Sequence, residues 1–225
     1  MRFKALLLDL DGTLLDTAPD MVGALNKLLE QENQKTVDFE KAQKFVSKGA
    51  VALVKYGFGE DLDNNRLEQL RSNFLDIYEK NVCVETKPFD GMLDILEWCE
   101  EQGIYWGVVT NKPDHLAKPI LDKLKLSDRS SVNVGGTTLN VTKPNPAPLL
   151  HCTTLLSIVP SECLYVGDDE RDIQAGRSAG MDTAVAAWGY IDDSLNPEDW
   201  QPNFICNQPK GLFRLIKELA EKNPE

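Results

Sequence analysis

The chain has 225 residues, of which 42% are hydrophobic and 27% are charged, so it can bury a full core without disulfides or metals. Its 24 basic and 36 acidic residues give a net charge of −12, which argues against a nucleic-acid partner because such proteins carry a basic face. The five cysteines have no paired spacing and no apolar run could cross a bilayer, so we expect a cytoplasmic protein with no membrane partner. The composition leaves its oligomeric state open, as a monomer or a homodimer.

The first predicted strand covers residues 3–8, and three helical patterns follow it before any other strand. These patterns lie at 19–32, 38–56 and 63–79. We expect residues 17–85 to form an all-helical cap domain, inserted after the first strand, that covers the strand ends and excludes water from a site there. The alternative is that the three helices pack on the sheet as ordinary scaffold.

From residue 86 onward, short apolar runs alternate with helical patterns. Strands are predicted at 104–110, 131–134, 163–166, 183–187 and 203–206, and helices at 91–102, 114–124, 146–157 and 171–179. Apolar runs without polar alternation are typical of parallel strands that are covered on both faces. The pattern therefore predicts an α/β fold, a Rossmann-like parallel sheet with helices on both faces, formed by residues 1–16 and 86–225.

Two carboxylates, Asp9 and Asp11, directly follow the first predicted strand. Gly12 permits a tight turn there and a close approach of a ligand to the backbone. In open α/β sheets, ligands bind at the carboxyl ends of the strands, so these side chains are candidates for a site. The alternative is an Asp-Gly turn that only ends the strand.

Polar groups also follow the strand predicted at 104–110. Thr110 and Asn111 offer a hydroxyl, an amide and backbone N–H groups, all of which are good phosphate donors. Farther along the chain, Lys143 precedes the segment Pro144-Asn145-Pro146, whose two prolines stiffen the backbone just before a helix. A fixed ammonium at that point could pair with an anion, although a lysine in such a loop is more often solvated.

Three aspartates follow the strand predicted at 163–166: Asp168, Asp169 and Asp172. Carboxylates this close repel one another unless a cation or a proton lies among them. The alternative is an acidic helix N-terminus that the helix dipole stabilises. All of these groups fall at one edge of the predicted sheet, where oxygen ligands from Asp9 and Asp168, together with water, suit Mg²⁺.

In chain order, the four segments read DLDGTLLDT (9–17), VVTN (108–111), TKPNP (142–146) and VGDDERD (166–172). With these motifs the chain resembles the haloacid dehalogenase superfamily of phosphatases over its whole length, including a helical cap between the first motif and the second. The resemblance implies Mg²⁺-dependent hydrolysis of a small anionic phosphate ester. Within the superfamily, Asp11 favours phosphoryl transfer over dehalogenation, because a departing halide needs no proton.

The resemblance also implies a two-step reaction. Asp9 would attack phosphorus and form an aspartyl-phosphate, as a carboxylate that is ionised at neutral pH without help. Asp11 would protonate the leaving alkoxide and then deprotonate the water that hydrolyses the intermediate.

The remaining polar residues would bind the phosphoryl group and the metal. Thr110 and Asn111 would bind the phosphoryl group, and Lys143 would offset the repulsion between it and the nucleophile. The metal would have three protein ligands: Asp9, Asp168 and the backbone carbonyl of Asp11. Two further carboxylates would lie just outside these ligands: Asp172 and Asp169.

Within the superfamily, the chain is most similar to the phosphoglycolate phosphatase group. It also resembles the branch of bacterial N-acetylmuramic acid 6-phosphate phosphatases of cell-wall recycling, through segments that include 17–20, 106–113, 176–180 and 188–191. Residues 47–50 lie where caps of this type place a specificity loop between two helices. We therefore expect Lys48 or Ser47 to contact the organic part of the substrate, and the alternative is an exposed lysine between two helices.

Three other functions remain open at this stage. A phosphomutase of the same superfamily would share the motifs but keep water away from its aspartyl-phosphate. A phospho-accepting signalling module gathers similar residues, but its acceptor follows a middle strand in a chain of about half this length. A non-catalytic binder of phosphate esters would not need the complete set of aspartates and lysine.

Overall fold

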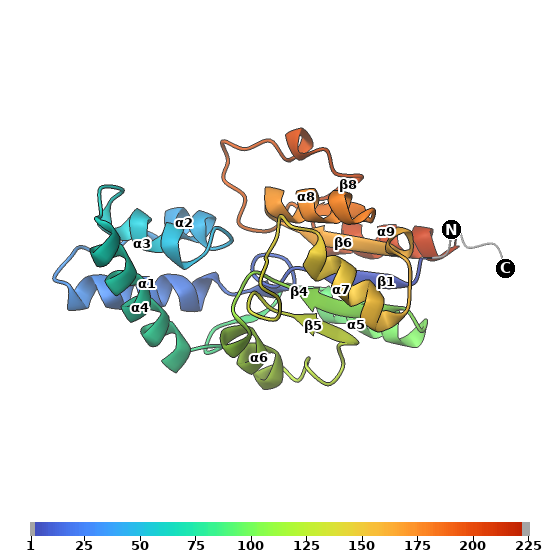
Figure 1. Cartoon of the computed structure of the whole chain (residues 1–225), viewed down its shortest axis with the longest axis horizontal. Helices are drawn as coiled ribbons and strands as arrows, with labels where there is room; N and C mark the ends of the chain where they lie inside the picture. Colours follow the sequence, from blue (N-terminus) through green and yellow to red (C-terminus); the bar gives the residue numbers. More distant parts are fainter. Residues whose placement is uncertain (1–2, 222–225) are drawn as a thin grey trace.

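The computed structural model describes residues 3–221, which form a six-stranded parallel sheet surrounded by helices (Figure 1). The strand order is β5-β4-β1-β6-β7-β8, with each neighbouring pair parallel. The strands are β1 (Ala5–Leu8), β4 (Tyr105–Val109), β5 (Val132–Val134), β6 (Cys163–Gly167), β7 (Asp182–Ala186) and β8 (Phe204–Cys206). The predicted α/β fold is therefore confirmed, with all six predicted strands in one sheet.

The helices cover both faces of this sheet because its central strand is apolar on both sides. In β1, Leu6 and Leu8 join one core cluster with α5 (Met92–Glu101), α6 (Asp114–Lys123) and α9 (Pro209–Glu221), whereas Leu7 joins another with α7 (Ala147–Leu156) and α8 (Glu170–Ala179). Two 3₁₀ turns, η2 (Pro160–Glu162) and η3 (Pro197–Trp200), complete this part of the chain. No helix within residues 3–221 is long and apolar enough to span a membrane.

One helix has no counterpart among those predicted. The α9 helix follows the last strand, and its Leu212 and Ile216 are fully buried four residues apart. This spacing is that of one helix face, so the sequence did contain the signal.

Residues 17–85 form helices that lie together at one end of the molecule (Figure 1). They are α1 (Ala18–Gln31), α2 (Phe39–Ala42), η1 (Gln43–Phe45), α3 (Ala50–Phe58) and α4 (Asn64–Lys80). The prediction of one continuous helix at 38–56 is wrong, because the helix is interrupted between η1 and α3. Gly49 has a φ of 87° there, a conformation that residues with a side chain rarely adopt.

Two short antiparallel strands connect these helices to the sheet: β2 (Leu15–Asp16) and β3 (Lys87–Pro88). Beside them, the buried Asp20 carboxylate accepts four hydrogen bonds of 2.6–3.0 Å, from the backbone N–H groups of residues 84–86 and the Thr86 hydroxyl. Asp20 thus holds the first turn of α1 to residues 84–86, which lead back to the sheet.

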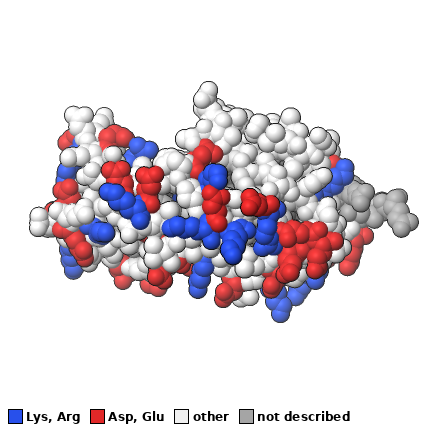
Figure 2. Space-filling view, turned by 90° about the horizontal axis from the view of Figure 1, so that it is seen from below, with Lys and Arg blue, Asp and Glu red and all other residues white. Residues whose placement is uncertain are grey.

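Charges of both signs lie on the face of the molecule seen in Figure 2, mostly over its lower half. Figure 2 shows one face, on which lysine and arginine side chains are interspersed with aspartate and glutamate side chains. On this face, acidic side chains gather at the lower right of the view with basic ones beside them, and the upper part is largely uncharged.

Candidate active site

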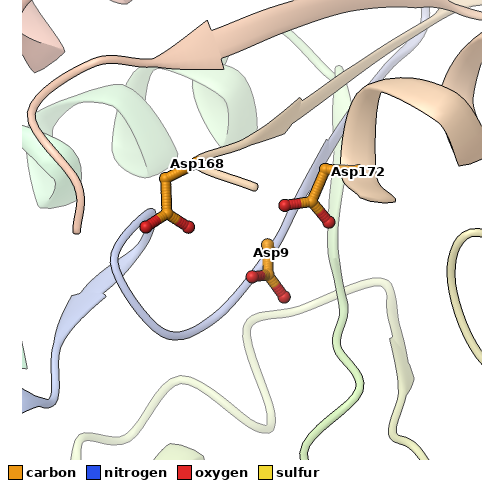
Figure 3. Close-up of side chains that lie close together, drawn as sticks. All are labelled: Asp9, Asp168 and Asp172. Carbon is orange, nitrogen blue, oxygen red and sulfur yellow. The ribbon is translucent and has the colours of Figure 1, made fainter. Parts of the chain in front are cut away.

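Three buried carboxylates meet at the carboxyl edge of the sheet (Figure 3). Asp9 follows β1, Asp168 follows β6, and Asp172 lies in the first turn of α8. One oxygen of each lies within 4.8 Å of the others. The strand order places β1 between β4 and β6, where successive connections run to opposite sides of the sheet, and such a point is where open α/β sheets bind ligands.

Lys143 is buried among these carboxylates, although a solvated position was the alternative. Its ammonium contacts Asp9 at 2.8 Å and Asp172 at 2.6 Å. It also lies 2.9 Å from the Val109 carbonyl and 2.7 Å from the Tyr165 hydroxyl. The opposite charges and hydrogen bonds raise the pKa of Lys143 despite the cost of burial, so the ammonium stays charged.

Asp168 lacks a cationic partner among the described residues. Its carboxylate accepts hydrogen bonds from the Ser47 hydroxyl at 2.7 Å, the Tyr190 backbone N–H at 2.8 Å and the Thr13 hydroxyl at 3.3 Å. Burial, reinforced by the charges of Asp9 and Asp172, raises the pKa of Asp168 well above its ordinary value. A cation beside Asp168 would offset the cost of burying its charge. The carboxylate oxygens of Asp9, Asp168 and Asp172 therefore fit a hard divalent metal ion.

Gly12 allows the turn after β1 to approach Asp168. Its φ is +78°, and a Cβ atom at this position would lie 2.1 Å from an Asp168 carboxylate oxygen. A side chain would therefore push the two acidic loops apart, and the glycine is required for the cluster.

Burial also changes the protonation of Asp9. It raises the pKa of Asp9 from 3.8 to about 7, although the positive charge of Lys143 acts in the opposite direction. In the metal-free protein Asp9 is therefore only partly ionised at neutral pH, whereas the sequence led us to expect a carboxylate that is ionised without help. A cation bound beside Asp9 would favour its ionised form, which is the nucleophilic form.

Asp11 leaves the same loop but has separate partners. Its carboxylate accepts a hydrogen bond of 2.6 Å from the Thr17 hydroxyl and pairs with the Lys112 ammonium at 2.9 and 3.1 Å. Lys112 was not among the predicted site residues. The signal available was its position directly after Thr110 and Asn111.

Thr110, Asn111 and Asp169 also lie near the three carboxylates, but each has different hydrogen-bond partners. The Thr110 hydroxyl accepts from the Lys112 backbone N–H at 3.1 Å. The Asn111 side chain bonds the backbone of Lys143 on both sides, at 2.9 Å each, and so holds the lysine loop in place. Asp169 caps α8 and pairs with Arg171 at 2.7 Å, and it lies outside the three-carboxylate cluster.

A pocket of about 260 Å³ opens beside these groups. At one end, which we call the carboxylate end, it is lined by Asp9, Asp11, Asp172 and Lys143. Opposite lies the helical wall, the part lined by residues 17–85, with the apolar side chains Met21, Val46 and Leu75, the aromatic Tyr78, and the cations Lys48 and Arg71.

Residues 47–49 bring the helical wall into contact with the carboxylate end. Besides the bond from Ser47 to Asp168, the Arg171 guanidinium donates to the Ser47 carbonyl at 2.6 Å. Lys48 lies at the pocket with its ammonium 5.2 Å from the centre of the Phe45 ring. The two predicted contact residues therefore both lie at the pocket.

Tyr165 and Tyr190 are two further residues that sequence reasoning missed. The Tyr165 hydroxyl lies 3.0 Å from an Asp172 oxygen and 2.9 Å from the Val109 carbonyl. The Tyr190 hydroxyl donates to Asp16 at 2.7 Å. Tyr165 stands in an apolar strand that looks like ordinary core, and Tyr190 belongs to the segment 188–191, which indicated a family branch but no role in the site.

This arrangement brings together, in one buried place, a carboxylate that could attack a substrate, a fixed cation and three carboxylates that could hold a divalent ion. A second carboxylate, Asp11, lies in the same pocket and could move a proton. Such a set suits attack on an anionic phosphorus centre, where the charges of nucleophile and substrate must both be offset.

Comparison with known proteins finds a family match and relatives that cover most of the chain. Residues 6–186 match the family model for haloacid dehalogenase-like hydrolases. The chain is 42% identical over 216 residues to the N-acetylmuramic acid 6-phosphate phosphatase of Pseudomonas aeruginosa, covering 96% of each. It is 41% identical over 211 residues to the phosphoglycolate phosphatase of Xylella fastidiosa, covering 94% of this chain and 92% of that one.

A solved structure agrees with this family match. The crystal structure of a predicted phosphoglycolate phosphatase from Haemophilus somnus has a TM-score of 0.85 to this chain at 26% identity, covering 96% of this chain and 99% of that one. The resemblance inferred from the four motifs is confirmed. These relatives are named phosphatases, which are phosphoric monoester hydrolases.

Proposed function

The chain belongs to the haloacid dehalogenase-like hydrolases, and we propose that it is a Mg²⁺-dependent phosphatase that hydrolyses a small phosphomonoester through an aspartyl-phosphate. The observation that carries this proposal is the buried meeting of Asp9, Asp168 and Asp172 around the ammonium of Lys143. Buried like charges are kept together only where a cation or a reacting group uses them.

The metal would be held by the carboxylates of Asp9 and Asp168 and by the backbone carbonyl of Asp11. When bound, Mg²⁺ supplies positive charge that offsets the developing charge on the phosphoryl oxygens. Asp172 is hydrogen-bonded to Lys143 and Tyr165, so it would orient the lysine rather than serve mainly as a ligand.

In the first step, the Asp9 carboxylate forms a bond to phosphorus while the bond from phosphorus to the ester oxygen breaks. Asp11 gives a proton to the departing alkoxide, and Lys143 balances the negative charge between nucleophile and substrate. The hydroxyl of Thr110 and the backbone after it supply donors for the phosphoryl oxygens.

In the second step, Asp11 removes a proton from a water molecule, which attacks phosphorus. The acyl phosphate bond breaks, inorganic phosphate leaves, and the Asp9 carboxylate is regenerated. The paired Lys112 and Thr17 would keep Asp11 directed toward the pocket in both steps.

Residues 17–85 would act as the cap domain, and residues 1–16 and 86–225 would form the catalytic core. Two contacts support the role of residues 17–85 as a cover over the site. Ser47 reaches Asp168, and Lys44 forms an ion pair with Asp193 of the core. The cap would thereby exclude water from the pocket and present Lys48 to the organic part of the substrate.

Two substrates are candidates, and each has support among the relatives. Phosphoglycolate is favoured by the group resemblance and by the Xylella relative, and N-acetylmuramic acid 6-phosphate is favoured by the Pseudomonas relative. Phosphate release should be measured for both esters, ranked by kcat/KM, with Mg²⁺ and with EDTA. We expect metal-dependent turnover of at least one of them.

The outcomes of this experiment separate the remaining possibilities. No phosphate release from any ester, with binding retained, would indicate a non-catalytic binder. A long-lived phosphorylated protein without turnover would indicate a signalling module. Conversion of a sugar phosphate to its isomer, without net phosphate release, would indicate a phosphomutase.

A further inference from the structure

The hydroxyl of Tyr78 is buried and unsatisfied. Tyr78 lies in α4, is 1% exposed and lines the pocket as part of the helical wall. Its hydroxyl has no hydrogen-bond partner within residues 3–221, the part of the chain that the structure describes. Leaving a buried hydroxyl unpaired costs about 1–3 kcal/mol, so such a group in a pocket points to a ligand.

A buried ammonium lies beside this hydroxyl. The Lys112 Nζ atom is 4.7 Å from the centre of the Tyr78 ring and pairs with both oxygens of Asp11. Its other neighbours are the Met21 sulfur at 3.6 Å, which is a weak acceptor, and the oxygen of Tyr78, which helps to raise the pKa of Lys112 and leaves the Tyr78 proton without an acceptor. Since an ammonium has three N–H donors, Lys112 can offer one of them to an oxygen in the pocket.

We propose that the Tyr78 hydroxyl and the Lys112 ammonium form a subsite that binds an acceptor oxygen on the leaving group of the substrate. This inference rests on the proposed phosphatase function and names the part of the substrate that the helical wall recognises. Burial raises the pKa of Tyr78 to about 12, so its hydroxyl keeps its proton and remains a donor at neutral pH.

The position of Lys112 fixes which part of the substrate reaches the subsite. Asp11 contacts the ester oxygen in the proposed reaction, and Lys112 is one hydrogen bond away from Asp11. The Lys112 ammonium therefore lies within two hydrogen-bond lengths, about 6 Å, of the ester oxygen. The carboxylate of phosphoglycolate fits this distance, and so does a hydroxyl or ring oxygen near the ester oxygen of a sugar phosphate.

The subsite would act by rejecting esters that lack this oxygen. Met21, which contacts Lys112, and Leu116 are 5% and 2% exposed and line the same pocket, so little water can replace a missing substrate group. A substrate without the acceptor would leave a desolvated hydroxyl and an N–H unpaired, and sites built this way discriminate strongly.

The test is the variant Tyr78→Phe, assayed with a matched set of esters. Phosphoglycolate offers a carboxylate, N-acetylmuramic acid 6-phosphate offers sugar oxygens, and ethyl phosphate offers no acceptor besides its phosphate. The measured quantity is kcat/KM for the better of the two oxygen-bearing esters divided by kcat/KM for ethyl phosphate. In Tyr78→Phe we expect this ratio to fall about tenfold or more if that ester is phosphoglycolate, whose acceptor is a carboxylate. We expect a fall of about threefold to tenfold if the acceptor is a neutral sugar oxygen. The loss should appear mainly as a higher KM.

Two controls separate this role from a structural one. Tyr56→Phe removes a hydroxyl from α3, outside the residues that line the pocket, and should leave the ratio unchanged. The Tyr78→Phe variant should melt at the same temperature as the wild type or higher, because it removes an unpaired buried group.

The possible failures are distinguishable. An equal loss for all esters in Tyr78→Phe, an unchanged ratio, or a melting temperature several degrees lower would overturn the subsite while the phosphatase proposal stands. Absence of phosphate release from every ester by the wild type would overturn both.

Discussion

The carboxylate end of the pocket and the helical wall are built on different principles. At the carboxylate end, the charged groups come from the loop after β1, from α8 and from the Lys143 loop, and Asp9 and Asp172 pair with Lys143. The helical wall is mostly apolar, and its polar groups are few and less fully paired. The difference indicates that the sheet edge carries the chemistry and that the helices carry the choice of substrate.

The largest expected effect comes from the nucleophile. Asp9→Asn replaces a carboxylate with an amide, a poor nucleophile and a weaker metal ligand, so kcat should fall by more than about 10⁴-fold for every ester. Phosphate release by the purified variant measures this loss, with a parallel wild-type preparation as the control for contamination. Retained turnover would remove the proposed role of the carboxylate end.

Asp11→Asn should have a smaller effect that depends on the leaving group. Without the acid, an alkyl phosphate should lose about 100-fold or more in kcat, whereas p-nitrophenyl phosphate should lose less because its leaving group needs no proton. The comparison of kcat for the two esters measures this dependence. Equal losses would argue against proton transfer by Asp11.

Lys48→Ala tests the helical wall at its exposed rim. An exposed cation contributes little, so we expect kcat/KM for the best substrate of the panel to fall only about fivefold. Lys41→Ala, on the exposed surface of the same segment, is the matched control. An unchanged kcat/KM in Lys48→Ala would show that this lysine does not contact the substrate.

The smallest effect concerns stability rather than turnover. Because burial raises the pKa of Asp9 from 3.8 to about 7, the folded metal-free protein keeps a proton between these values that the unfolded chain loses. Raising the pH through this window therefore removes stability from the wild type but not from Asp9→Asn. In EDTA, the melting temperature of Asp9→Asn relative to wild type should rise by several degrees between pH 4 and pH 8.

Magnesium provides the control for this last experiment. It should stabilise the wild type at pH 8 more than the Asp9→Asn variant, because binding favours the ionised carboxylate. A difference in melting temperature that does not depend on pH would contradict the raised pKa of Asp9.

The carboxylate end was more predictable from the sequence than the helical wall. Asp9 and Asp168 each directly follow a buried strand, and parallel strands bring their carboxyl ends to one edge, so local patterns were enough. Lys112 and Tyr78 meet only through the packing of α4 beside the loop after β4. Neither residue stands in a local pattern that signals this contact.

The same contrast holds for the fold. The six strands were predictable because their apolar runs are local. The break at Gly49 was not, since a helical periodicity continues through residues 38–56 while one glycine conformation interrupts it. The α9 helix was missed although its pair of buried residues, Leu212 and Ile216, has helical spacing.

The Asp20 carboxylate has a mechanical consequence. It lies in the first turn of α1 and binds the backbone N–H groups of residues 84–86, so it holds the start of the helical segment to its end. A movement of these helices away from the sheet would therefore carry the start of α1 and residues 84–86 together.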